Sequence, residues 1–226
     1  MFGQSNIANH GDLYDRYTPA ANVVHANING NWELATSPPT TATHLATGTN
    51  GNMDGRIGDH LLNSGLYDRV YIMNVAVNAT MLHMWRPDAP ANVCTKTDRY
   101  MDLFQYANNR LFERLQYAKQ MSDKFGFEYT HVLMHIGESD NLAGTTTDKF
   151  KADYASVNGG LTSLGVDAPR FIGRTSFLPF ATPQYNPAII QAQNDIITQY
   201  TNTYAGPNTD NFPPYYAYRH DTVHLS

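Results

Sequence analysis

Cysteine, charge and long apolar runs are scarce in this sequence, and each shortage excludes a class of protein. The 226 residues include a single cysteine, Cys94, so the chain forms no intrachain disulfide, and Cys94 lacks the spacing of a zinc knuckle. Charged residues make up only 15% of the chain, whereas about a quarter is usual. The net charge is −5 and no basic run could neutralise adjacent phosphates, so we expect no nucleic-acid partner.

Apolar segments are too short for a membrane span. The longest stretches, such as residues 70–77, fall far below the roughly 18 residues that cross a bilayer. We therefore expect a soluble chain without a membrane partner. The first residues carry neither the charged nor the apolar segment of a secretion signal, so we expect no signal peptide in this chain.

Uncharged side chains must supply most of the surface polarity. Hydrophobic residues make up 42% of the chain, which has 21 Asn, 22 Thr and 15 Tyr but only five Lys. This composition predicts a folded chain rather than a disordered one. No repeat or long linker divides it, so residues 1–226 are predicted to form a single domain. The composition favours an extracellular or surface-associated location.

Short apolar runs alternate with amphipathic segments after an irregular stretch at about 16–55, which we interpret as loop. Residues 70–77 and 129–136 are typical of buried strands, and residues 170–177 are a weaker third candidate. Three- and four-residue spacing of apolar positions predicts helices over about 99–124, 150–164 and 189–200. The alternation predicts an α/β fold with three layers and a mainly parallel sheet. Ligands of such sheets bind beyond the carboxyl ends of the strands.

Two segments at opposite ends of the chain carry candidate catalytic groups. In Gly3-Gln4-Ser5-Asn6, a serine between a strand and a helix can present its hydroxyl at the sheet edge, although a serine at such a place is more often a helix N-cap. Near the other end, Asp221 could hold one nitrogen of His224 and leave the other free as a base. A metal pair of His220 and His224 with Asp221 is one alternative, and a solvated polar tail is another.

A third polar segment directly follows a predicted strand. In Gly137-Glu138-Ser139-Asp140 the glycine permits a sharp turn, so the residues after it are expected at the same edge as Ser5. A glycosidase carboxylate pair is the alternative for Glu138 and Asp140, but residues this close on one turn cannot readily flank a sugar.

Together the three segments resemble the SGNH hydrolase superfamily, and within it the carbohydrate esterase branch that includes sialate O-acetylesterases and acetylxylan esterases. That branch has its nucleophile in Gly-Gln-Ser-Asn, as at 3–6, a block Gly-Glu-Ser-Asp, as at 137–140, and its base in Asp-x-x-His, as at 221–224. Residues 70–85 and 188–193 also match, so the resemblance covers essentially the whole chain. It implies a flavodoxin-like α/β/α fold.

The resemblance also implies ester hydrolysis through an acyl-enzyme, with no metal or other cofactor. Ser5 would be the nucleophile, His224 the base, and Asp221 the group that fixes the imidazole tautomer. Backbone N–H groups of Ser5 and Ala79 would meet the developing oxyanion. The other residues implied at the site are Asn78 and Ser139 at the oxyanion hole, and Gln4, Asn6, Gly137 and Glu138 in support of the nucleophile.

Several positions depart from the pattern of that branch. Asn78-Ala79 stands where a Gly-Gly turn is common, so the N–H of Ala79 is a donor only if alanine adopts the glycine conformation. Ser139 stands where other members of the superfamily carry an asparagine that donates to the oxyanion. Only two residues precede Gly3, so we expect a short or truncated first strand, completed in a homo-oligomer or in a longer protein.

The substrate is expected to be an acylated carbohydrate, because Trp85 and Tyr218 could offer flat rings to a sugar. Tyr218 belongs to the cluster at 215–218. Packing in the core is the alternative for these aromatic residues. The reaction predicted first is removal of an acetyl group. A small ester with a short acyl or an aryl group is the alternative substrate. A glycan-binding module with an inactive triad is the alternative outside enzymes.

Overall fold

The computed structural model describes residues 1–12, 14–26, 30–38, 46, 50–90, 110–212 and 218–225. Its main sheet has four parallel strands in the order β1-β5-β6-β7, with the bounds Phe2–Gly3, Val132–His135, Arg170–Arg174 and Thr203–Asn208. The two-residue β1 is the short first strand expected from the sequence. It pairs with β5 so that Phe2 lies opposite Met134, and both side chains are buried in the core.

A second sheet has the order β3-β2-β4, with the bounds Trp32–Leu34, Val23–Ala26 and Val70–Ile72. Strands β2 and β3 are antiparallel, whereas β2 and β4 are parallel. The interpretation of residues 16–55 as loop is therefore wrong for β2 and β3. Strands of three and four residues are too short to show a clear alternation of apolar and polar positions.

The predicted strand 70–77 forms a strand only over residues 70–72, in the second sheet. Strand β4 ends at Ile72, and the buried residues after it continue beside β1. There the backbone N–H groups of Val75 and Val77 donate to the carbonyls of Met1 and Gly3, at 2.9 and 3.0 Å. This segment joins the second sheet to the main sheet and brings the following turn, residues 78–79, next to the end of β1.

Five α-helices lie in the described part of the chain: α1 (Asp54–Asn63), α2 (Leu111–Phe125), α3 (Glu138–Leu142), α4 (Thr147–Ser163) and α5 (Pro187–Gln199). The hydroxyl of Thr146 caps α4 by accepting from the N–H of Lys149. The predicted helix at 99–124 corresponds to α2, although residues 99–109 lie outside the described residues. None of the described helices is long and apolar enough to cross a membrane.

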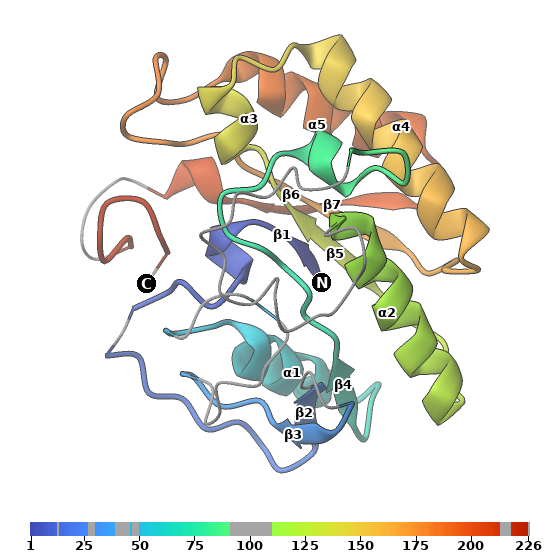
Figure 1. Cartoon of the computed structure of the whole chain (residues 1–226). Coiled ribbons are helices and arrows are strands. Elements are labelled where there is room, and N and C mark those ends of the chain that lie inside the picture. The colour runs from blue at the N-terminus through green and yellow to red at the C-terminus, as the bar shows by residue number, and fades with distance from the viewer. Residues whose placement is uncertain are drawn as a thin grey trace.

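Helices and sheets form layers. Figure 1 shows α3, α4 and α5 on one side of the main sheet, and α1 at the opposite side of the molecule with β2, β3 and β4. Apolar residues of α4 and α5, including Phe150 and Ile189, pack into one core with Met134 and Ile172 of the sheet. The predicted three-layer α/β/α fold with a mainly parallel sheet is confirmed. Strands β1 and β5 end at the carboxyl edge of the main sheet, at Gly3 and His135.

Candidate active site

Ser5 lies in a tight turn at the carboxyl end of β1, at the start of a short 3-10 helix (Ser5–Ile7). A Cβ on Gly3 would lie 2.0 Å from the carbonyl oxygen of His135, so only glycine lets β1 approach β5 this closely. The next N–H, of Gln4, donates to the same oxygen at 3.1 Å. We call residues 4–7 the nucleophile segment. All four are buried, and Ser5 is only 4% exposed.

Polar groups at the start of α3 hold the nucleophile segment. Glu138 is fully buried, and its Oε1 accepts from Nδ2 of Asn6 at 2.8 Å. The backbone N–H of Ser139 donates to Oε1 of Gln4 at 3.1 Å. Gly137 permits the turn before them, because a Cβ there would lie 2.1 Å from a backbone carbonyl oxygen. The structure thus places the four residues predicted to support the nucleophile in one buried network.

Asp140, two residues further along α3, holds the turn predicted to supply the oxyanion donor. Its Oδ2 accepts from the N–H of Leu82 at 3.0 Å, just after residues 78–79. Burial raises the pKa of Asp140 to about 7, against hydrogen bonds from Leu82 and Thr145 that lower it. Ala79 has a φ of +55°, so this alanine does adopt the left-handed conformation that glycine more often occupies. Both Asn78 and Ala79 are exposed.

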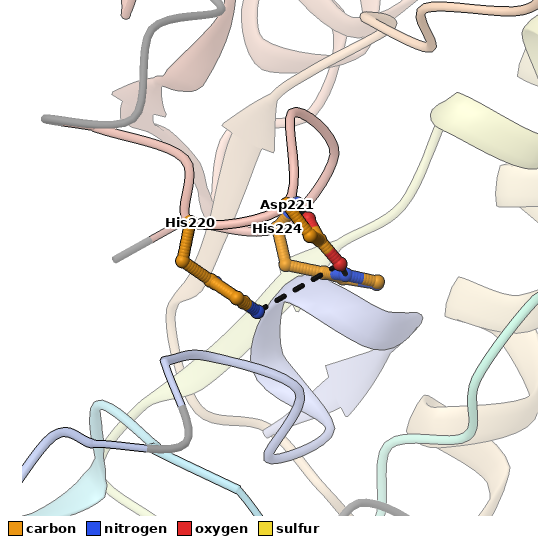
Figure 2. A group of neighbouring side chains, drawn as sticks. All are labelled: His220, Asp221 and His224. Atoms are coloured by element: carbon orange, nitrogen blue, oxygen red, sulfur yellow. Dashed lines mark hydrogen bonds and ion pairs between the residues drawn. The ribbon is translucent and has the colours of Figure 1, made fainter.

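The base candidate lies in residues 219–225, which we call the base segment. Nδ1 of His224 lies 2.6 Å from Oδ2 of Asp221, a hydrogen bond that leaves Nε2 free to accept a proton. Figure 2 shows the imidazole and the carboxylate pointing toward each other. Burial raises the pKa of Asp221, but hydrogen bonds from the N–H groups of His224 and Val223 and from the imidazole outweigh this effect and bring the pKa to about 2. Asp221 is therefore ionised at neutral pH.

A buried arginine fixes the backbone of the base segment. Arg219 is 1% exposed, and its guanidinium donates to the carbonyl oxygens of Val223 and Thr209. The same group lies 4.7 Å from the ring centre of Phe177. Arg219 belongs to none of the motifs predicted from the sequence, and only its place directly before His220 hints at a role. A planar group with five donors suits a clamp on two carbonyls.

One hydrogen bond brings the two segments together. The N–H of Leu225 donates to Oδ1 of Asn6 at 2.8 Å, across 219 positions of sequence. Asn6 follows Ser5 directly, and Leu225 follows His224 directly, so the nucleophile and base candidates lie on adjacent segments. The described residues show no hydrogen bond between the Ser5 hydroxyl and the His224 imidazole. Catalytic hydrogen bonds are often long before substrate binds.

Two further histidines stack on His224. The ring centres of His10 and His220 lie 5.5 and 5.9 Å from that of His224, with interplanar angles of 26° and 24°. Burial, followed by the neighbouring His224, lowers the pKa of His10 to about 4. The sequence spacing does not predict a place for His10 at the site, because only the tertiary structure brings it next to His224. His220, Asp221 and His224 also form a set of metal-ligating side chains whose ligand atoms all lie within 4.8 Å of one another.

The two aromatic residues expected to contact a sugar differ in exposure. Trp85 is 0% exposed, packs against Phe2, and donates from Nε1 to the hydroxyl of Thr80 at 3.1 Å. The prediction that Trp85 offers a ring to substrate is therefore corrected: its position behind the 78–79 turn makes it part of the core. Tyr218 is 46% exposed and lies against Phe212. Residues 215–217 lie outside the described residues.

The structure also has cavities away from the nucleophile and base segments, at the amino ends of the strands. One of about 190 Å³ is lined by His131, Leu133 and Tyr67 among others. The nucleophile segment and the base segment meet instead at the carboxyl edge, where ligands of open parallel sheets bind.

No protein-family model matches the chain, and no curated protein matches its sequence. Solved structures match its fold. A protein from Arabidopsis thaliana is 15% identical with a TM-score of 0.72, over 100% of this chain and 89% of that one. NanS is 15% identical with a TM-score of 0.58, over 90% and 74%. The psychrotrophic esterase EstA from Pseudoalteromonas sp. is 14% identical with a TM-score of 0.45, over 74% and 73%. At these identities the likeness to the first two concerns the fold alone, and it agrees with the three-layer α/β/α arrangement described above.

Proposed function

We propose that the chain is a serine ester hydrolase that removes acetyl groups from carbohydrate through an acyl-enzyme intermediate. The observation that carries the proposal is the hydrogen bond from Leu225 to Asn6, because it joins the segment of Ser5 to the segment of His224. The 2.6 Å contact between His224 and Asp221 supplies the second requirement of a triad, a base held in one tautomer.

The reaction proceeds in two half-reactions. Nε2 of His224 takes the hydroxyl proton of Ser5 as Oγ attacks the acetyl carbonyl, and Asp221 stabilises the imidazolium that forms. His224 then gives this proton to the sugar oxygen, which leaves as an alcohol while the acetyl group stays on Ser5. Water, deprotonated by His224, attacks the acetyl-enzyme and releases acetate, with Ser5 recovering its proton.

The negative charge on the carbonyl oxygen needs donors in place before the reaction. We assign this role to the backbone N–H groups of Ser5 and Ala79, on adjacent turns, with the polar groups of Asn78 and Ser139 as further donors. The left-handed conformation of Ala79 supports the assignment, because it gives alanine the backbone shape of the common Gly-Gly turn. Loss of one such donor typically costs about 10²- to 10³-fold in kcat.

Tyr218 is the exposed aromatic residue that we propose contacts the sugar. The burial of Trp85 removes the second ring expected there, and this favours one alternative: a small ester with a short acyl or an aryl group as substrate. The two substrate classes differ in whether activity depends on the alcohol part of the ester.

The test compares wild type, Ser5→Ala and the control Ser163→Ala, an exposed serine on α4. We expect Ser5→Ala to lower acetate release from p-nitrophenyl acetate and from acetylated xylan by at least about 10³-fold, while Ser163→Ala retains wild-type rates. Equal rates for wild type and Ser5→Ala would refute the proposal. Activity on the aryl ester alone would select the alternative substrate class.

A further inference from the structure

The base segment holds one histidine that the proposed hydrolysis does not use. Nε2 of His220 lies 3.7 Å from Oδ2 of Asp221, the oxygen that also contacts Nδ1 of His224. Figure 2 shows the three side chains converging on one point. Within the described residues the imidazole of His220 makes no hydrogen bond, and its other nitrogen, Nδ1, is buried without a partner. Hydrogen bonding therefore does not account for the orientation of this ring.

We propose that His220, Asp221 and His224 form a binding site for a transition-metal ion such as Zn²⁺, and that the bound ion inhibits ester hydrolysis. The inhibitory part of this inference rests on the proposed function, whereas the binding part does not. Two imidazoles and one carboxylate are a ligand set that zinc uses in proteins, with a fourth position left to water.

The geometry fits an ion after small side-chain movements. Ligand atoms about 2.0–2.2 Å from a tetrahedral zinc ion lie about 3.3 Å from one another. The contact of Asp221 with His224, now 2.6 Å, must open slightly, and its contact with His220, now 3.7 Å, must close slightly. Both changes are modest. The Asp221 side chain is 43% exposed and that of His220 is 20% exposed, so an ion can reach them from solvent.

Inhibition follows from the tautomer of His224. Catalysis needs the proton on Nδ1, donated to Asp221, and a lone pair on Nε2 that faces Ser5. An ion on Nδ1 displaces that proton, and a neutral imidazole bound through Nδ1 carries its remaining proton on Nε2. The ring then has no lone pair for the proton of Ser5. The ion also occupies the oxygen of Asp221 that would stabilise the imidazolium.

Binding is tested first, by calorimetric titration of Zn²⁺ into metal-free protein that carries no histidine tag. The proteins are wild type, Ser5→Ala, His220→Gln and the control His60→Gln, an exposed histidine of α1 outside the cluster. We expect one ion per chain in wild type, Ser5→Ala and His60→Gln. Loss of one of three ligands should weaken binding by about tenfold or more in His220→Gln. Equal affinity in wild type and His220→Gln, or no binding to wild type, overturns the proposal.

Inhibition is then measured with p-nitrophenyl acetate, each variant being compared with its own metal-free rate. We expect Zn²⁺ to inhibit wild type and His60→Gln, EDTA to restore the rate, and His220→Gln to need about tenfold more zinc for the same inhibition. Zinc that binds at His220 without slowing hydrolysis contradicts the inhibitory role. A protein that binds zinc as expected but hydrolyses no ester leaves the metal site standing and removes the proposed function.

Discussion

The nucleophile segment and the base segment meet at one edge of the sheet, but they are built differently. Residues Gln4, Ser5 and Asn6 are 3%, 4% and 7% exposed. The buried carboxyl group of Glu138 and the backbone N–H of Ser139, both at the start of α3, bond to Asn6 and Gln4. In the base segment the side chain of Asp221 is 43% exposed and that of His224 is 18% exposed. One half of the site is thus part of the core, and the other half is a surface loop.

Because of this difference, we expect substitutions in the two segments to affect the stability of the fold and the rate of hydrolysis to different extents. Buried polar groups are costly when they lose a partner, so changes in the nucleophile segment should lower both stability and rate. Exposed charge pairs contribute little to folding, so changes at Asp221 should lower the rate and leave stability nearly unchanged. Asn6 is the exception, because its side chain belongs to the buried network and also anchors Leu225 of the base segment.

The largest expected effect tests the exposed half. Asp221→Asn should lower kcat/KM for p-nitrophenyl acetate by about 10³- to 10⁴-fold, because the amide cannot stabilise the imidazolium or hold its tautomer. The amide oxygen of this variant can still accept from the N–H groups of Val223 and His224, so the free energy of unfolding in urea should fall by less than about 1 kcal/mol. Asp167→Asn, an exposed carboxylate at the other end of the sheet, is the control. A large loss of stability in Asp221→Asn would contradict the expectation that the base segment affects the rate but not the stability.

The next largest effect concerns the hydrogen bond between Asn6 of the nucleophile segment and Leu225 of the base segment. Asn6→Ala removes the acceptor for Leu225 and leaves the buried carboxylate of Glu138 without its donor. We expect a loss of about 1–3 kcal/mol in the free energy of unfolding and a fall in kcat of about 10- to 100-fold, because misplaced catalytic groups lose effective concentration. Asn194→Ala, an exposed residue of α5, should change neither quantity appreciably. Wild-type kcat in Asn6→Ala would show that the base segment does not need this anchor.

A smaller effect concerns pH and the buried half. Asp140 has a pKa of about 7 in the folded chain, above its ordinary value of 3.8. Between these values the folded chain retains a proton that the unfolded chain has lost, so stability decreases as pH rises through this window. The slope is at most about 1.4 kcal/mol per pH unit for one proton. Asp140→Asn, which does not titrate, should show a flatter dependence in urea unfolding at several pH values. Asn194→Ala, which changes no titratable group, should keep the wild-type slope.

The smallest effect concerns the exposed ring beside the base segment. Tyr218→Ala should raise KM for acetylated xylan by about two- to tenfold, the loss of one aromatic contact, with kcat unchanged. The same variant should retain wild-type KM for p-nitrophenyl acetate, which has no sugar. Parallel changes on both substrates would place Tyr218 in the support of the base segment instead.

Local patterns in the sequence were sufficient for several local interactions, although they missed the short antiparallel pair of β2 and β3. Asp221 and His224 lie three residues apart on one turn, and their hydrogen bond follows the spacing from which the dyad was predicted. Helix α4 and the buried strand β5 followed in the same way, from the spacing of apolar positions and from an apolar run. Trp85 shows the limit of such patterns, because the same indole can lie in a core or at a surface, and the packing of Phe2 and Thr80 around it decides.

The sequence by itself determined the α/β class, the alternation that places polar segments at strand ends, and the residue types offered for catalysis, because these depend on neighbours along the chain. Only the tertiary structure decided that Asn6 accepts from Leu225, that His10 stacks on His224, and that residues 73–77 join two sheets. Each of these contacts joins segments far apart in sequence. Their formation depends on how the sheet closes and what it buries, and no local periodicity encodes that.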